Sequence, residues 1–227
     1  MAVGVVISVI VAFLVGLPTL RLKGDYLAIA TLGVAEIIRV AVTNMKITNG
    51  AAGISGVPLT NTWTITYVAL VVTTILILNY TFSSAGRATY AVLQDEIAAE
   101  SMGVQVTKYK ILAFVLGAAT ASIGGTLSAT TLGAVTPSDF TFMKSIEVLI
   151  IVVFGGIGSF TGSFVAAVLL GIINLVLQPF GQLRMIIYAV ALILIMIFRP
   201  GGLLGTWEFK LGDFKFSKKK ETKESGK

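Results

Sequence analysis

Long runs of apolar residues constrain the fold of this chain more than any motif does. A helix needs about 20 residues to cross the hydrocarbon core of a bilayer. Six segments approach or exceed that length: residues 2–20, 26–42, 63–82, 111–135, 145–156 with the residues before it, and 162–199. The last segment contains Pro and Gly near its middle, at residues 178–184, and therefore predicts two helices joined as a hairpin.

The composition is that of a membrane protein. Charged residues make up 12% of the chain and the mean hydropathy is +0.93, whereas soluble domains contain roughly 25% charged residues. We therefore expect an all-α, polytopic bundle of about six transmembrane helices over residues 1–204. Residues 205–227 follow as a basic tail that is expected to be disordered.

The distribution of positive charge predicts an orientation. The net charge is +6, and eight of the 17 Lys and Arg residues lie between Arg199 and Lys227. This basic end favours an anchor to anionic lipid headgroups on the cytoplasmic side and no nucleic-acid binding. With the tail inside, alternating spans leave Lys46, Lys144 and Arg184 outside and every other Lys and Arg that flanks a span inside. Met1 then lies outside without a signal peptide, so we expect an N-terminal part to be missing.

The residue types that are absent exclude several kinds of chemistry. The chain contains no cysteine and no histidine, so thiolate or imidazole metal sites and Cys–His nucleophilic pairs are excluded. No metal or cofactor is expected, and an intramembrane enzyme would lack its nucleophile and base. A secondary carrier would need its own ion site, and few deep carboxylates are available beyond Glu36 and Glu147. A purely structural membrane subunit is left open as an alternative.

Charged residues interrupt the apolar pattern between the third and fourth spans, in the stretch "DEIAAESMGVQVTKYK" (residues 95–110). Residues 90–102 contain no Gly or Pro and favour one helix, which Gly103 is expected to end. Thr107 is expected to cap the helix that follows. The spacing therefore predicts a short helix, a tight turn and a second helix.

The two sides of that short helix differ in character. Tyr90, Leu93 and Ile97 recur at helical spacing and are suited to packing on the membrane-embedded body. Another side carries small or polar residues that would let a partner approach, namely Ala91, Asp95, Ala98 and Met102. The element is either an interfacial helix that orders a loop or a docking element for a cytoplasmic motor protein.

Polar residues within the apolar segments are candidates for function. Glu36 and Arg39 are three residues apart on one helix and can pair, which offsets part of the cost of about 3 kcal/mol for each charge at mid-bilayer. A structural ion pair and a pathway gate are both open readings. Lys144 and Glu147 repeat the spacing near the outer surface, where pairing is uninformative. Asn174 is a lone amide that bonds a neighbouring helix or lies on the pathway.

Small residues recur where helices are expected to touch. In the fourth span they follow three- and four-residue steps that favour close packing of a neighbouring helix: Gly117, Ala121, Gly124 and Ser128. The stretch "GGIGSFTG" (residues 155–162) lacks the spacing and the lysine of nucleotide-binding loops. It is interpreted as a helix break on the cytoplasmic side, and a role in the translocation pathway is the alternative.

Five separated blocks resemble one family of transport proteins. They are "LRLKGDYLAIATLGVAEIIRV" (residues 20–40), "ITNGAAGISGVP" (47–58), "GRATYAVLQDEIAAESMGV" (86–104), "FTFMKSIEVLIIVVFGGIGSFTG" (140–162) and "FRPGGLLG" (198–205). In this order they are similar to the M-type permease subunits of the Liv system, the high-affinity ABC transporters for branched-chain amino acids. Family members carry additional N-terminal spans, and Asn49 stands where they often have a second glycine.

The resemblance implies a coupling site in the loop over residues 83–110. The segment "AAESMG" is similar to the Ala-Ala-x-x-x-Gly half of the motif by which ABC-importer permeases contact their ATPases. It assigns coupling to Ala98, Ala99 and Gly103, with Glu96 one residue before the place of the motif's first glutamate.

The loop over residues 43–58 is the expected outer counterpart. Its glycines allow a compact conformation, and in a transporter fed by a binding protein such a loop is suited to act as a lid or docking surface. Gly50 and Gly53 thus join Glu36, Arg39 and Asn174 as candidates for the translocation pathway or gate.

The resemblance also implies partners and location. It describes half of a pore in the inner membrane of a prokaryote, without catalytic activity of its own. A second, H-type permease forms the other half, two cytoplasmic ATP-binding subunits supply energy, and an extracytoplasmic binding protein delivers the solute. The solute itself is left open between branched-chain amino acids and urea or another small amide.

Overall fold

The computed structural model describes residues 1–22, 24–59, 63–156 and 158–177, together with residues 187, 190 and 193. The chain divides into two compact units, Met1–Phe142 and Met143–Lys227. Apart from residues 187, 190 and 193, the second half of the predicted terminal hairpin lies outside the described residues, and so does the basic tail.

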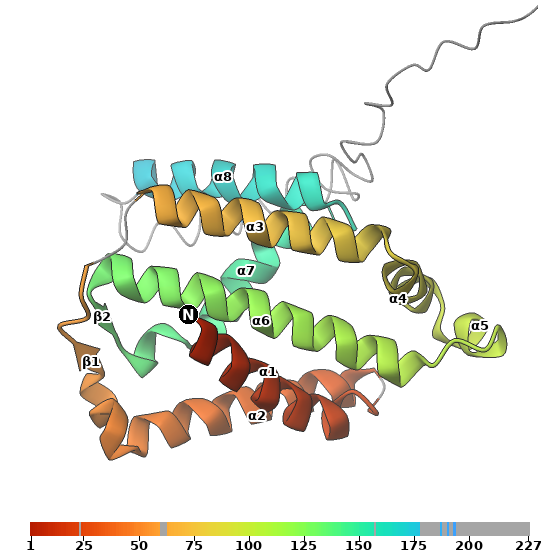
Figure 1. The fold of residues 1–227 in the computed structure, drawn as a ribbon, viewed down its shortest axis with the longest axis horizontal. Helices are drawn as coiled ribbons and strands as arrows, with labels where there is room; N and C mark the ends of the chain where they lie inside the picture. Colours follow the sequence, from red (N-terminus) through yellow and green to blue (C-terminus); the bar gives the residue numbers. More distant parts are fainter. Residues whose placement is uncertain are drawn as a thin grey trace, which may run out of the picture. The chain divides into compact units, whose positions relative to one another are not determined.

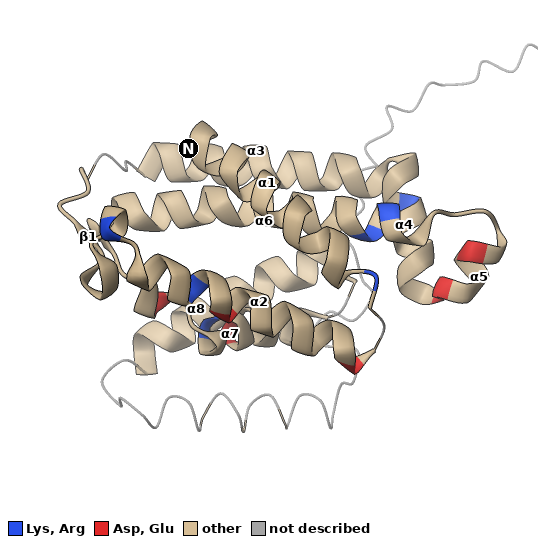
Figure 2. Ribbon diagram, turned by 90° about the horizontal axis from the view of Figure 1, so that it is seen from below, with Lys and Arg blue, Asp and Glu red and all other residues tan. Residues whose placement is uncertain are grey.

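Helices dominate both units, as Figure 1 shows. Within the described part of the chain, five helices are long and apolar enough to cross a membrane: α1 (Ala2–Thr19), α2 (Asp25–Asn44), α3 (Trp63–Phe82), α6 (Val106–Leu132) and α8 (Phe160–Leu177). Figure 2 shows α1 and α3 without a charged residue along their length. The prediction of an all-α bundle with about six spans is confirmed.

The helix α7 (Phe142–Gly155) is shorter than those five helices. Its 14 residues extend about 21 Å at 1.5 Å per residue, against about 30 Å for the hydrocarbon core. By itself α7 is therefore too short for a full span, although it is apolar, and a crossing by this segment needs the residues before it as well.

The first unit is organised by antiparallel packing of α1 against α6. The contact face of α1 is made of small residues, which lets the two backbones approach. A Cβ placed on Gly4 would lie 3.4 Å from Ser122 Oγ, and one on Gly16 would lie 3.3 Å from the Phe114 ring. Between them, Ser8 Oγ donates a hydrogen bond of 2.8 Å to the Ala118 carbonyl.

The small-residue stripe predicted to pack in the fourth span is not the one that α1 uses. Gly117, Ala121, Gly124 and Ser128 are exposed, and a Cβ on Gly117 or Gly124 would meet no atom within 4 Å. The contact is instead one residue further round α6, through Ala118 and Ser122. Two adjacent faces of α6 are rich in small side chains, and residue size alone does not predict which of them contacts α1.

A leucine at Gly16 is expected to weaken this packing by about 1–3 kcal/mol, because the added side chain must displace Phe114 and Leu20. Gly33→Leu in α2 is the matched control, since a Cβ there would meet nothing within 4 Å. Unfolding in mixed micelles on titration with sodium dodecyl sulfate measures both variants. Equal stability of the two would contradict the importance of the α1–α6 contact.

Short elements form a cap at the C-terminal end of α2, made of η1 (Lys46–Thr48), η2 (Gly50–Ala52), β1 (Ile54–Ser55), β2 (Ala134–Val135) and η3 (Pro137–Asp139). The strands pair antiparallel, with Ile54 opposite Val135 and Ser55 opposite Ala134. Thr136 and Asp139 form a reciprocal capping box at η3. The cap thereby joins the loop after α2 to the loop after α6.

The second unit is a helical hairpin of α7 and α8. A Cβ on Gly155 would lie 2.5 Å from the carbonyl carbon of Gly162, so the two helices touch backbone to backbone at the turn. Buried Ser159 caps α8, because its Oγ accepts a hydrogen bond of 3.0 Å from the Gly162 N–H. This geometry agrees with the interpretation of residues 155–162 as a helix break.

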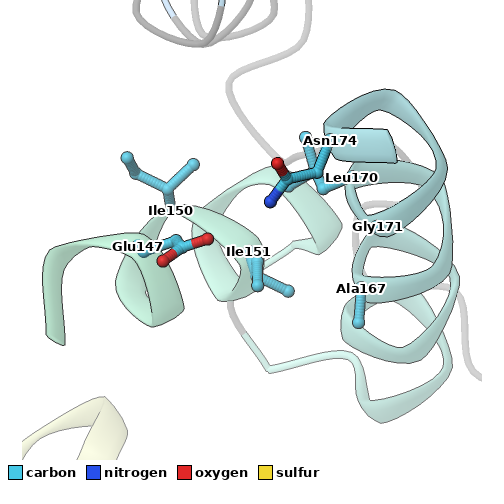
Figure 3. A pocket seen from close by; sticks show the side chains of 7 residues that line it. All are labelled: Glu147, Ile150, Ile151, Ala167, Leu170, Gly171 and Asn174. Atoms are coloured by element: carbon cyan, nitrogen blue, oxygen red, sulfur yellow. The ribbon is translucent and has the colours of Figure 1, made fainter. Parts of the chain in front are cut away.

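Away from the turn the hairpin opens into a cavity, shown in Figure 3. Phe154, Ala166 and Leu170 form the buried cluster next to it, with Ile150 and Ile151 packed against that cluster. Tight contact at one end and a cavity further along define the shape of the hairpin.

Candidate functional site

The loop between α3 and α6 folds as two helices rather than one. They are α4 (Ser84–Gln94) and α5 (Glu96–Ser101), and we call residues 84–105 the knob. Asp95 separates them in an extended conformation, and its Oδ1 accepts hydrogen bonds from Ile97 N at 2.8 Å and Ala98 N at 3.0 Å. The prediction of one helix over residues 90–102 is therefore wrong, because the Asp95 side chain caps a new helix instead of continuing the first.

The end of α5 was predicted correctly. Gly103 has a φ of 84°, a conformation that favours glycine. Its N–H donates to the Glu100 carbonyl at 2.9 Å, and the Val104 N–H donates to the Ala99 carbonyl at 3.0 Å. These two bonds form a Schellman motif, which stops the helix with its last carbonyls paired.

The beginning of α6 differs from the prediction. The helix starts at Val106 and its N-cap is Gln105, which makes no side-chain capping bond. Thr107 thus lies inside the first turn and does not cap. An ion pair from Lys110 to Glu96 ties α6 to α5, so α5 is held by a cap, a turn and a charge pair.

The knob exposes apolar side chains on its outer surface. Ile97 is 75% exposed and Met102 is 85% exposed, with Ala98 exposed beside them, whereas Ala99 is buried. Tyr90 and Leu93 are exposed as well. The prediction that Tyr90, Leu93 and Ile97 pack on the body is wrong, because the break at Asp95 changes the helical phase and Val92 is the buried side chain of α4.

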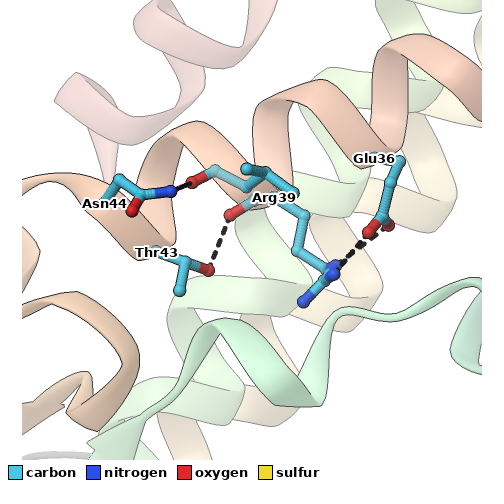
Figure 4. Close-up of polar contacts among 5 residues, drawn as sticks. Glu36, Arg39, Thr43 and Asn44 are labelled. Atoms are coloured by element: carbon cyan, nitrogen blue, oxygen red, sulfur yellow. Dashed lines mark hydrogen bonds and ion pairs between the residues drawn. The ribbon is translucent and has the colours of Figure 1, made fainter.

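The ion pair in α2 forms as the spacing predicted. Arg39 Nε donates a hydrogen bond of 2.9 Å to Glu36 Oε2, and the second guanidinium nitrogen pairs with Glu36 Oε1 (Figure 4). Two parallel bonds make the contact bidentate. The helix end that follows is rich in side-chain to backbone bonds, with Thr43 Oγ1 on the Arg39 carbonyl and Asn44 Nδ2 on the Val40 carbonyl, each at 2.8 Å.

Gly50 and Gly53 belong to the cap that follows α2. Gly53 has a φ of 72°, and a Cβ on it would lie 2.9 Å from Thr136 Cα and still closer to the Val135 carbonyl. A Cβ on Gly50 would lie 3.2 Å from the Thr43 carbonyl. Sequence reasoning selected these glycines because they allow a compact loop. The structure adds that Gly53 lies in close contact with Val135, which is 82 residues further along the chain.

The first unit thus carries its two sets of candidate residues at opposite ends of α6. The knob precedes the first residue of this helix, and β2 of the cap follows its last (Figure 1). The 27 residues of α6 extend about 40 Å at 1.5 Å per residue, which matches a bilayer with its headgroups. Asn174 lies in the second unit, where it lines the cavity between α7 and α8.

The described residues thus define an α-helical, multi-pass membrane protein with a knob that exposes apolar side chains at one end of its longest helix. Comparison with known proteins gives its family. The family model for the permease component of branched-chain amino acid transport systems matches residues 1–198. The chain therefore belongs to that family. No solved structure matches the chain.

Three relatives show the range of similarity, and each is named as a permease protein of a high-affinity branched-chain amino acid transport system. LivM of Salmonella typhimurium is 37% identical over 87% of this chain and 55% of its own length. BraD of Pseudomonas aeruginosa is 33% identical over 54% of this chain and 40% of its own. LivH of Escherichia coli is 30% identical over 63% of this chain and 46% of its own length. The chain spans about half the length of these relatives.

Proposed function

We propose that this chain is a membrane-spanning permease subunit of an ATP-driven importer for branched-chain amino acids. The observation that carries the proposal is the family match over residues 1–198 together with 37% identity to LivM. The chain forms half of the translocation pore and hydrolyses no ATP itself. Its partners are an H-type permease, two cytoplasmic ATP-binding subunits and an extracytoplasmic solute-binding protein.

The knob is the proposed contact with the ATPases. Its exposed Ile97, Ala98 and Met102 offer an apolar surface, and the Asp95 cap, the Gly103 turn and the Glu96–Lys110 pair hold that surface in place. A rigid element transmits the movement of an ATPase to the membrane helices. Buried Ala99 acts by seating α5 rather than by touching the partner.

The opposite end is the proposed outer mouth. The cap with Gly50 and Gly53 covers the C-terminal end of α2, and the Glu36–Arg39 pair lies on α2 before it. We assign the cap as a lid or docking surface for the binding protein, and the ion pair as a gate or a structural lock beneath it.

From the distribution of Lys and Arg we also propose that the knob and the C-terminal tail are cytoplasmic, and single-cysteine labelling tests this orientation. The chain has no native cysteine. Labelling of Ser101→Cys or Ser217→Cys therefore reports only the introduced cysteine. Neither is expected to react with an impermeant maleimide added to intact cells, and both are expected to react after permeabilisation. Labelling of Ser101→Cys in intact cells would overturn the orientation.

Uptake by the reconstituted importer tests the proposed function itself. Proteoliposomes that contain this chain with its partner permease and ATPases, and the loaded binding protein outside, are expected to accumulate radiolabelled leucine, isoleucine and valine when ATP is enclosed. Urea is the comparison solute. Accumulation of urea without the amino acids would replace the proposed solute, and accumulation without ATP would indicate a secondary carrier.

A further inference from the structure

The cavity of the second unit combines one carboxylate and one carboxamide with an apolar lining. It is bounded by Glu147, Ile150 and Ile151 of α7, and by Ala167, Leu170, Gly171 and Asn174 of α8. The cavity is small, with a volume of about 100 Å³, so it suits contact with part of a solute rather than enclosure of a whole ligand. Figure 3 shows the Glu147 and Asn174 side chains directed toward each other from the two facing helices.

The cavity follows from the helical spacing of these residues. Glu147, Ile150 and Ile151 are three and four residues apart and share one face of α7, and the four residues of α8 share its facing side in the same way. The helices touch at Gly155 and Gly162. Further along, a Cβ on Gly171 would meet nothing within 4 Å, so small residues of α8 leave the space that the cavity occupies.

We infer that this cavity is a solute contact that recognises an aliphatic α-amino acid by its ammonium group. This inference rests on the proposed function. The Glu147 carboxylate is the acceptor for the ammonium, the Asn174 carboxamide offers a donor to the solute carboxylate, and the isoleucine and leucine side chains contact the branched hydrocarbon. Urea, which has neither an ammonium group nor a hydrocarbon chain, fits this lining poorly.

Lys144 is the internal competitor for the same carboxylate. Its Nζ donates to Glu147 Oε2 at 2.9 Å, one helical turn away. A carboxylate accepts at both oxygens, and the pair is half-exposed, so a solute ammonium can join or replace the lysine. The sequence analysis interpreted this pair as an uninformative surface contact. The spacing of residues within α7 does not predict that α8 packs beside Glu147.

The test is protection of a cysteine placed in the cavity. Ala167→Cys is introduced into this chain and assembled in nanodiscs with a cysteine-free partner permease and ATPases. Leucine is expected to slow its modification by a methanethiosulfonate reagent, whereas 4-methylpentanoate, which has the same hydrocarbon chain without the ammonium group, does not. Val176→Cys, on α8 outside the lining, is the control whose labelling leucine leaves unchanged.

Two further variants separate recognition from structure. Glu147→Gln is expected to raise the leucine concentration for half-protection about tenfold, the effect of losing a hydrogen bond between charged groups, while Lys144→Gln leaves it unchanged or lowers it. Equal protection by 4-methylpentanoate, or equal shifts from the two variants, would overturn the inference. Such a result with normal leucine uptake leaves the proposed function standing, whereas absent uptake by the unmodified complex refutes that function separately.

Discussion

Replacing Ala98 with glutamate is expected to abolish ATP-driven solute uptake while the protein still inserts and assembles. Ala98 is exposed on α5 beside Ile97 and Met102, so a longer side chain meets no obstacle in the chain itself. In the docked complex the same carboxylate would be buried without a partner, at a cost of about 3–5 kcal/mol. We expect docking to weaken at least about 100-fold, and uptake with stimulated ATP hydrolysis in proteoliposomes measures the loss.

The matched control is Thr107→Glu, which adds the same charge at an exposed residue outside the knob, in the first turn of α6, and is expected to retain uptake. Ala99→Glu does not serve, because Ala99 is buried and its replacement would disrupt the knob. Normal uptake with normal ATPase stimulation in Ala98→Glu would show that α5 orders a loop and docks nothing.

Breaking the Glu36–Arg39 pair is expected to have the second large effect. Glu36 lies near the middle of α2 and Arg39 nearer its C-terminal end, so either charge left alone within the bilayer costs about 3 kcal/mol. Glu36→Leu and Arg39→Leu are each expected to reduce the amount of folded protein in the membrane several-fold. Quantitative immunoblotting of membranes measures the amount, and uptake per assembled complex measures function.

The double variant, Glu36→Leu with Arg39→Leu, decides between the two roles of the pair. A structural lock predicts that removing both charges restores both the amount of protein and its uptake, because no unpaired charge remains. A gate predicts that the amount recovers while uptake per complex stays low. Single variants with wild-type amount and uptake would contradict both roles.

The spans were predictable from the sequence because burying charge in lipid is costly, and membrane-spanning segments therefore appear as long apolar runs with few charged residues. The third span was predicted at the bounds that α3 has, residues 63–82, and α2 differs from its prediction by one or two residues at each end. By contrast, α6 begins five residues before the predicted residue 111. Its first residues include Lys108 and Lys110, which a search for apolar runs excludes although they favour a helix.

The knob shows why local geometry was harder to predict. Asp95 lies in a run of good helix formers, and composition alone favours one helix there. The residue is also one of the strongest N-caps, and the pattern of Asp followed by helix-forming residues was a signal that sequence reasoning passed over. The predicted faces assumed one continuous helix over residues 90–102. Because the helix breaks at Asp95, residues before and after the break no longer share a face.

Contacts between distant segments were not predictable from spacing. Gly53 lies against the backbone of Val135 and Thr136, and nothing near Gly53 in the sequence identifies those partners. Glu147 likewise became a candidate only when α8 placed Asn174 across the cavity from it. Periodicity assigns residues to a face of one helix, and a second helix is needed to form a site.

Photo-cross-linking from Ile97 tests the docking role of the knob most directly. A photoreactive phenylalanine analogue at this 75% exposed residue is expected to form a light-dependent adduct with the ATPase subunit in the assembled complex. The same analogue at Ile47, which is 92% exposed in η1 at the opposite end of the unit, is expected to form none. An ATPase adduct from Ile47 and none from Ile97 would contradict the account.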